Sequence, residues 1–245
     1  MRAAATLTAG AGRMRWRDAP PVVLRPTGGD RVHLVHAAGG PLGGDELSLH
    51  AEVAGGRSLR VCSVAATVVQ PGVAGTPASW RVELDVAAGG RLCWQPQPTV
   101  LTDGACLHSD LQVRLADTAF AALREVVVLG RAGQAGGRYR GGLAVTVGQR
   151  PLLRHESLLD GADAELCGPA GTGGYRVYGS LLVAGAGVDP GKSLAHNAPG
   201  LRWARMPLAG PGCLVLALGE SVTAVDAVLD ELLATMLPTV SGGRE

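Results

Sequence analysis

This sequence of 245 residues lacks the bulky side chains that fill most protein cores. It contains no isoleucine and a single phenylalanine, Phe120, and aromatic residues make up only 3% of it. Hydrophobic residues still account for 47% of the chain, so a sizeable core must be built from valine, leucine and alanine. The abundance of alanine, glycine and arginine is typical of GC-rich coding, and alanine is therefore weak evidence for helix here.

A strong charge of either sign is also absent, because the net charge is +1. A broad nucleic-acid surface needs a basic excess, so we expect no nucleic-acid partner. The cysteines stand alone without a CxxC pair, which predicts a reducing compartment and neither a disulfide framework nor a structural zinc site. They are Cys62, Cys93, Cys106, Cys167 and Cys213.

Long hydrophobic runs are missing too. The start of the chain has no apolar run of roughly 7–15 residues that would indicate a signal peptide. No stretch approaches the ~18 apolar residues of a membrane span, so we expect a cytoplasmic protein with no membrane partner. Residues 1–20 show little pattern and are expected to be frayed or to form a loosely attached strand. No linker divides the chain, which favours a single domain over 1–245.

The most distinctive segment is residues 39–46, Gly-Gly-Pro-Leu-Gly-Gly-Asp-Glu. Glycine reaches backbone angles closed to other residues, and proline fixes one of them. The segment therefore predicts a shaped turn between two strands, with Asp45 and Glu46 at its exit.

Alternating apolar and polar residues predict strands at 31–36, 47–53, 59–64 and 82–86. The pattern around Val53, with Ala-Gly-Gly-Arg following, recurs around Val86 and more faintly around Leu115. These positions lie about 30 residues apart, and repeats of that length predict stacked β layers. A glycine-rich β meander without stacked layers would produce similar sequence repeats.

Further strands are expected at 126–129, 143–147, 151–153, 175–183 and 213–218. Only the end of the chain is helical, with Ser221 as N-cap and Pro238 as the stop. The apolar residues at helical period are Val222, Val225, Leu229, Leu232 and Met236. The predicted fold is mainly β, with stacked antiparallel sheets of solenoid or sandwich type and a C-terminal α-helix near 221–237.

Motifs for catalysis are weak or missing. Residues 186–193 approach a P-loop spacing and end in Lys192-Ser193, but the following residues leave no room for the helix that such a loop requires. His33 and His36 are three residues apart on a predicted strand and so point to opposite faces. We find no catalytic triad, and we expect neither catalytic residues nor a tightly bound cofactor.

Two stretches break the rules of ordinary strands. Residues 92–105 contain Pro96 and Pro98, which cannot donate to a β ladder and so predict an edge or a shaped crossing. At the head of the apolar run 126–129 stands Glu125, and a buried carboxylate needs a partner or a role. Arg124 or Arg131 could be that partner.

Together these stretches resemble the UreD (UreH) family of urease accessory proteins. The resemblance is carried by 39–46, by Ala65-Ala66-Thr67, by 92–105 with Trp94-Gln95-Pro96-Gln97, by 125–131 and by Arg150-Pro151-Leu152-Leu153. It is strong from about 30 to 160 and weak beyond.

The resemblance implies a non-enzymatic scaffold that binds urease apoprotein and UreF, and through UreF the GTPase UreG, to deliver nickel to urease. It also implies a mostly β fold and a polar internal route for transient Ni²⁺. The matching route positions are Asp45 and Glu125, with His155 where the family usually has an acid. From the residues alone two alternatives remain: a P-loop nucleotide-binding protein that uses 186–193, and a partner-binding β scaffold with no metal role.

Overall fold

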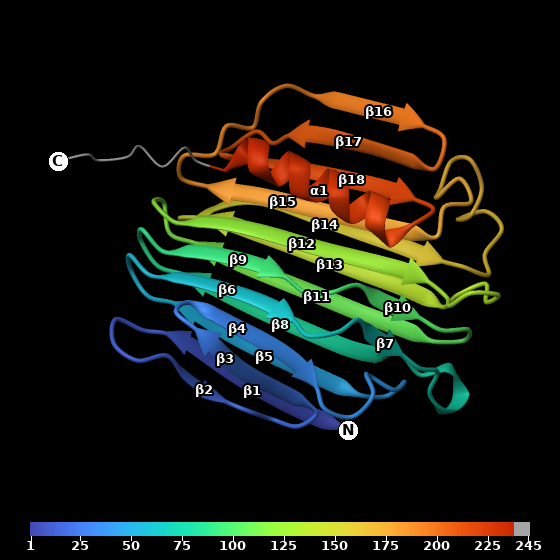
Figure 1. Cartoon of the computed structure of the whole chain (residues 1–245), viewed down its shortest axis with the longest axis horizontal. Helices are drawn as coiled ribbons and strands as arrows, with labels where there is room; N and C mark the ends of the chain where they lie inside the picture. The colour runs from blue at the N-terminus through green and yellow to red at the C-terminus, as the bar shows by residue number, and fades with distance from the viewer. Residues whose placement is uncertain (238–245) are drawn as a thin grey trace.

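The computed structural model describes residues 1–237 and shows two stacked β-sheets with one helix on the outside (Figure 1). Sheet A has the order β14-β13-β11-β8-β5-β1-β2. Its strands are β1 (Arg2–Ala9), β2 (Arg15–Arg17), β5 (Glu46–Val53), β8 (Ala78–Val86), β11 (Cys106–Leu115), β13 (Arg138–Val147) and β14 (Arg150–Asp160).

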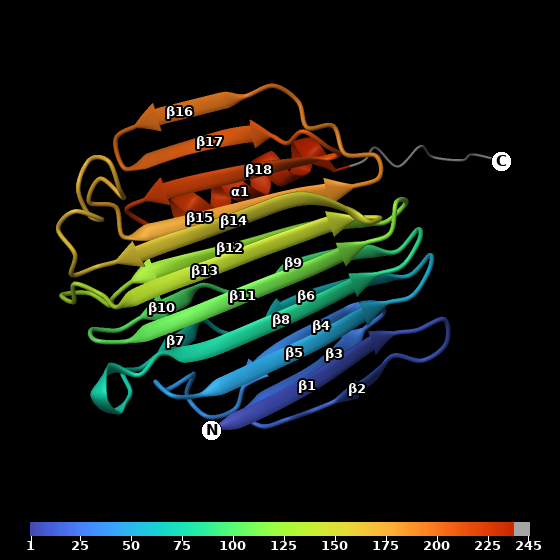
Figure 2. The same ribbon diagram turned by 180° about the vertical axis from the view of Figure 1, so that it is seen from behind.

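Sheet B lies against sheet A and has the order β16-β17-β18-β15-β12-β9-β6-β4-β3, with β10 and β7 continuing it beside β12 (Figure 2). Its first strands are β3 (Val22–Gly28), β4 (Arg31–His36), β6 (Ser58–Ser63), β7 (Thr67–Val69), β9 (Arg91–Gln95) and β10 (Thr99–Leu101). The remaining strands are β12 (Phe120–Leu129), β15 (Val177–Gly185), β16 (Leu194–Ala198), β17 (Leu201–Pro207) and β18 (Gly212–Gly219). A short 3-10 turn, η1 (Val73–Gly75), precedes β8.

The repeat seen in the sequence is a structural repeat. Val53 pairs with Val86, Val86 with Leu115, and Leu115 with Val147 in neighbouring strands of sheet A. The chain alternates between the sheets, so that each coil adds one strand to both. This confirms the solenoid-like stacking. The strand direction differs from expectation, because successive coils enter the sheet in the same sense and β5, β8, β11 and β13 run parallel.

The core between the sheets is built from small aliphatic residues, as the composition requires. Every second residue of β5 and β8 points inward, which buries Leu49, Val53, Leu84 and Val86. The interior also contains the rings of Trp80, partly buried, and Trp94, 4% exposed.

The first residues are more firmly attached than expected. All of β1 pairs in parallel with β5, from Arg2↔Glu46 to Ala9↔Val53, and β2 covers its other side. Alternate residues of β1 are buried. The pattern is weak in the sequence because the inward positions are mostly alanine, which contrasts little in hydrophobicity with the residues between them.

The helix α1 (Val222–Met236) confirms the predicted C-terminal helix. The Ser221 hydroxyl caps it by accepting a hydrogen bond from the Ala224 amide at 3.2 Å. Its apolar face packs on the outer side of β12, β15 and β18. Arg124 on β12 reaches Asp230 at 2.8 Å and Asp226 at 3.5 Å on the helix. Pro238, the expected stop, lies outside the described residues.

Candidate functional site: a polar cavity behind a window in sheet B

Sheet B is interrupted beside Glu125. The strand β9 pairs with β12 as far as Trp94↔Leu123, and β10 resumes the pairing only at Thr99↔Val127. The neighbouring coil repeats the break, between Cys62↔Gln95 and Thr67↔Thr99. Residues 64–66 and 96–98 therefore leave the sheet, and we call the gap between them the window. In Figure 1, β6 and β9 end short of β7 and β10.

The two prolines explain the window. Neither Pro96 nor Pro98 has an N–H group for the ladder, and one extra residue in each coil forces the chain to bulge. The expected edge strand is wrong, because β9 and β10 lie inside sheet B with strands on both sides. The shaped crossing is confirmed.

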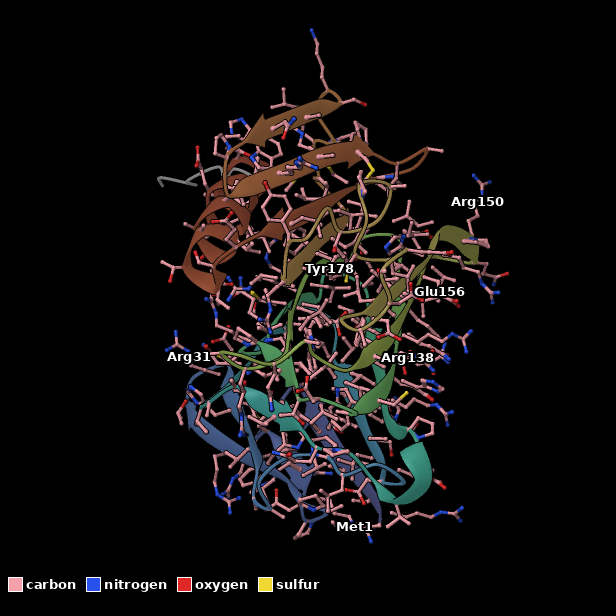
Figure 3. All side chains as sticks on the ribbon, turned by 90° about the vertical axis from the view of Figure 1, so that its right-hand side faces the viewer. Met1, Arg31, Arg138, Arg150, Glu156 and Tyr178 are labelled. Atoms are coloured by element: carbon pink, nitrogen blue, oxygen red, sulfur yellow. The ribbon has the colours of Figure 1, made fainter. Side chains whose placement is uncertain are left out.

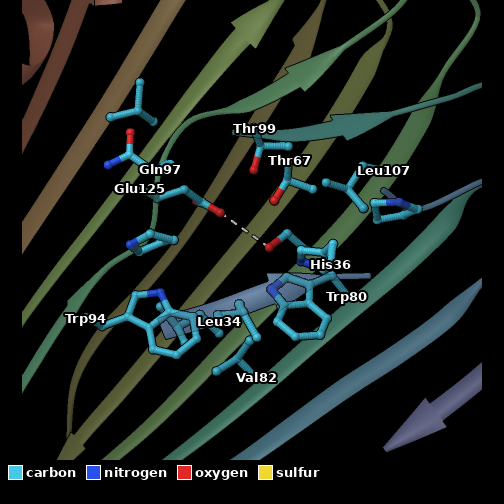
Figure 4. A pocket seen from close by; sticks show the side chains of 15 residues that line it. Leu34, His36, Thr67, Trp80, Val82, Trp94, Gln97, Thr99, Leu107 and Glu125 are labelled. Carbon is cyan, nitrogen blue, oxygen red and sulfur yellow. Dashed lines mark hydrogen bonds between the residues drawn. The ribbon is translucent and has the colours of Figure 1, made fainter. Parts of the chain in front are cut away.

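A cavity of about 40 Å³ lies between the sheets behind the window (Figure 4). Such a volume has room for water. Its polar lining consists of His36, Thr67, Gln97, Thr99, Ser109 and Glu125, and its apolar lining includes Trp80, Trp94 and Pro41. Gln97 is exposed and also lines the cavity, so the cavity reaches the surface beside the window.

Glu125 is the acidic group of this cavity. It projects from β12 toward sheet A, where the Ser109 hydroxyl of β11 donates to Oε1 at 3.3 Å. Burial raises the pKa of Glu125, although hydrogen bonding by Tyr139 and Ser109 partly opposes the rise. The expected arginine partner is wrong: Arg124 points to the opposite face and holds α1, and Arg131 is exposed beyond the end of β12. The carboxyl has hydroxyl neighbours and no cation.

The Tyr139 hydroxyl is a second buried group at this place. It lies beside the Glu125 carboxyl but makes no hydrogen bond of good geometry, and the residue is fully buried. Burial, together with the nearby carboxyl, raises the pKa of Tyr139 well above its usual value. The phenol is therefore neutral, and its polar neighbours are Glu125, Ser109 and Tyr178.

His36 faces the same cavity from the end of β4. Its Nδ1 is buried without a hydrogen-bond partner, and its ring meets Trp80 edge to face at 5.7 Å between centroids. Burial lowers the pKa of His36, so the imidazole is neutral near pH 7 and keeps a lone pair. His33 points away and contacts Thr27 at 3.0 Å, which confirms that the two histidines share no site.

Asp45 lies at the edge of the sheets and is only 5% exposed. Its carboxylate accepts from the Met1 ammonium group at 2.7 Å and from the Leu42 amide at 2.9 Å. Burial alone would raise the pKa of Asp45, but these two hydrogen bonds and the ammonium charge lower it. Asp45 thereby fixes the turn at 39–46, which delivers Pro41 to the cavity wall.

His155 lies on β14 in a separate polar cluster. Its Nε2 is 3.0 Å from Ser157 Oγ, which is 2.6 Å from the Tyr178 hydroxyl. Burial raises the pKa of Tyr178 to about 12 and lowers that of His155. Figure 3 shows Tyr178 within the molecule, whereas the neighbouring Glu156 projects from the surface. The charge of Glu125 contributes to the raised pKa of Tyr178, but the residues of this cluster do not line the cavity.

No three His, Cys, Asp or Glu side chains among residues 1–237 gather closely enough to hold a metal ion. The cavity offers one carboxyl, one imidazole and neutral oxygens, a set that would bind a divalent transition metal weakly. The P-loop reading loses its support, since strand β16 follows the 186–193 segment and β15 before it runs antiparallel to its neighbours. No helix in the same residues is long and apolar enough to cross a membrane.

Comparison with known proteins decides the family. A sequence model described as UreD urease accessory protein matches residues 11–244. The chain belongs to the UreD family. It is 44% identical over 208 residues to the urease accessory protein UreD of Frankia alni, which covers 77% of this chain and 68% of that one. The UreD of Streptomyces avermitilis is 38% identical over 221 residues, covering 88% of this chain and 87% of its own length. Membership implies a role in urease maturation and association with urease components.

Sequence reasoning found Glu125 and, in the motif stretches, the lining residues Thr67, Trp94 and Gln97, but it missed other residues around the Glu125 carboxyl in this UreD chain. Ser109, Tyr139 and His36 come from three other strands, and nothing local marks them as neighbours of Glu125. The available signal was the alternation of inward and outward residues along each strand, because a solenoid brings the inward positions of successive coils together. His36 was weighed only with His33, and the strand geometry that separated the pair also turned His36 inward.

Proposed function

We propose that this protein is a non-enzymatic urease maturation factor that passes Ni²⁺ through the cavity behind the window to urease apoprotein. It would act in the cytoplasm with a UreF partner and, through UreF, with the GTPase UreG. One observation carries the proposal: a carboxyl group without a cationic partner is enclosed in a polar cavity that reaches the surface. The five free cysteines fit a reducing compartment.

The chemistry of the cavity suits transit better than storage. A carboxylate and an imidazole are acceptable ligands for Ni²⁺, but two such donors with neutral oxygens leave the ion loosely held. The raised pKa of Glu125 also means that a proton competes with the metal. In this proposal Glu125 is the route carboxylate, Asp45 positions the cavity wall, and His155 lies on the continuation toward β14.

The test replaces Glu125 by glutamine, which keeps the shape and removes the charge. Glu156→Gln is the matched control, because Glu156 is an exposed carboxylate on sheet A that pairs with Arg140 at 2.9 Å. Urease is activated with the complete set of accessory proteins at limiting and at saturating nickel, and complex formation is measured in parallel. We expect at least a tenfold loss with Glu125→Gln at limiting nickel, recovery at high nickel, and intact complexes.

Glu156→Gln should activate urease as the parent does. Full activation by Glu125→Gln at limiting nickel would refute a cation route through this cavity. Full activation without the protein would refute the maturation role itself.

A further inference from the structure

A second pocket lies at the start of the solenoid, where three turns meet, and we call it the coil-end pocket. The turns are residues 10–14 between β1 and β2, 29–30 between β3 and β4, and 54–57 between β5 and β6. In Figure 1 the loop between β1 and β2 marks this end of the molecule, at the lower left. The eight-residue strand β5 separates it from the turn at 39–46, by more than about 20 Å. Its volume of about 630 Å³ is within the range of small-molecule sites.

One side of the coil-end pocket is apolar because the solenoid ends there. The strands β2 and β3 are the last ones of their sheets at this end, so no further coil covers the inward residues between them. Met14, Trp16 and Pro26 line the pocket at this open end. Met14 is packed against the core between the sheets, and Trp16 is 39% exposed. A half-exposed indole is a flat apolar surface on which a planar ring can stack.

The other side of the coil-end pocket is basic. Arg13 and Arg57 line it, with Asp30 as the single acid of the lining. Immediately after Asp30 comes Arg31, which stands directly opposite Arg60 in the neighbouring strand, and both arginines are exposed. Like charges in directly opposite positions destabilise a sheet. This end of the protein therefore keeps its positive charge at a cost in stability.

The four arginines of this end have no acidic partner in the described part of the chain. Among residues 1–237, no Asp or Glu forms an ion pair with any of them. Their guanidinium groups therefore have donors free for an anion. Acids of the adjoining strands have partners of their own: Asp18 with Arg25 at 3.0 Å, Glu52 with Thr8 at 3.4 Å, and Asp85 with Arg114 at 3.1 Å.

The two sides together select the class of ligand. Guanidinium groups match the geometry of phosphate oxygens, and an indole stacks on a planar ring. A phosphate alone would leave the apolar side without a contact, and a neutral ring alone would leave the arginines without an anion. We infer that the coil-end pocket binds a small organic phosphate that carries a planar ring, such as a nucleoside monophosphate. The phosphate lies on Arg13 and Arg57, and the ring lies on Trp16.

The test measures binding of adenosine monophosphate to the full chain by titration calorimetry. Adenosine, which lacks the phosphate, and ribose 5-phosphate, which lacks the ring, are titrated beside it. The variants are the double substitution Arg13→Gln with Arg57→Gln, and Trp16→Ala. Arg131→Gln is the matched control, because Arg131 is exposed after the end of β12, and Lys192→Ala tests the P-loop-like segment. Thermal unfolding of each variant checks the fold.

The parent should bind adenosine monophosphate with a Kd below about 1 mM, and adenosine and ribose 5-phosphate at least about tenfold more weakly. The double arginine variant should lose at least about tenfold in affinity for adenosine monophosphate. Trp16→Ala should lose at least about fivefold for adenosine monophosphate but should bind ribose 5-phosphate within about twofold of the parent. Arg131→Gln and Lys192→Ala should bind as the parent does.

No saturable binding by the parent up to roughly 10 mM would overturn the inference, as would unchanged affinity in the double arginine variant or in Trp16→Ala. A loss of affinity in Lys192→Ala would place the ligand at the other segment and would overturn it too. Tighter binding of a single-stranded oligonucleotide than of adenosine monophosphate would assign the basic end to nucleic acid, with the same consequence. The inference does not depend on the proposed function, which is tested through Glu125→Gln on β12.

Discussion

The glycine pair of β13 offers a sharp test of how the cavity is built. Gly141 lies two residues after Tyr139 on the inward face of the strand, and the tyrosine ring folds over it. A Cβ atom added at Gly141 would stand 2.5 Å from Cε1 and 2.6 Å from Cζ of that ring. Carbon atoms in contact are normally about 3.5–4.0 Å apart, so the Gly141→Ala substitution requires the ring to move.

Tyr139 has no free space to move into. The residue is fully buried, and Glu125, Ser109 and Tyr178 are its polar neighbours. Overpacking of this kind costs about 1–3 kcal/mol. Replacing glycine by alanine at an ordinary backbone conformation returns about 0.4–1 kcal/mol through the unfolded chain. We therefore expect Gly141→Ala to lower the free energy of unfolding by roughly 1–2 kcal/mol.

Gly142→Ala is the matched control in the same strand. Its added Cβ would meet Asp110 Oδ1 at 2.7 Å, but Asp110 is exposed and its carboxylate can rotate away, so stability should stay equal or rise slightly. Urea unfolding followed by tryptophan fluorescence measures both, and the loss in Gly141→Ala corresponds to a midpoint lower by roughly 0.5 M. Equal midpoints for the two variants would refute the steric reasoning.

Two further predictions concern charges that the fold has buried. Glu125 has a raised folded-state pKa, so the folded state holds its proton more tightly than the unfolded state. The contribution of Glu125 to the free energy of unfolding should therefore be largest below about pH 4.3, fall as pH rises through the folded pKa, and then level off. In urea titrations from acid to neutral pH, the stability of the parent relative to Glu125→Gln should fall as pH rises; a difference that does not change with pH would contradict it. Arg124→Met should lower the free energy of unfolding by about 1–3 kcal/mol, because Asp226 then loses its cation. This is less than the cost of breaking a fully buried ion pair, since this pair is partly exposed to solvent. The added substitution Asp226→Asn should recover most of the loss, and a double variant no better than the single one would count against the ion pair.

The sequence predicted the architecture well because a solenoid is a local repeat. The equivalence of Val53, Val86 and Leu115 could be recognised along the chain, and it is the pairing register of sheet A. Strand direction could not be inferred, since alternation is the same in parallel and antiparallel sheets. The attachment of β1 was not predicted because its inward alanines carry a weak signal. The β16–β17 hairpin was not predicted because its outer strand is exposed along nearly its whole length.

The cavity was predicted only in part for a related reason. A buried carboxylate is visible in one strand, as Glu125 was, but its partners belong to other coils and depend on the face that each residue occupies. Arg124 looked like a suitable partner because it is adjacent in sequence. Adjacent residues of a strand point to opposite faces. Arg124 and Glu125 are adjacent in β12, and for that reason they cannot pair.

Three violations of ordinary β-sheet rules meet at this one place. Pro96 and Pro98 interrupt strands in the interior of a sheet, Glu125 places a carboxyl between two apolar layers, and Gly141 leaves a strand without a side chain beneath a buried tyrosine. Each costs stability by itself. Local rules that are broken together in neighbouring strands are expected at functional sites. That convergence, more than any single residue, is the physical argument that the cavity and its window are what this fold is built to present.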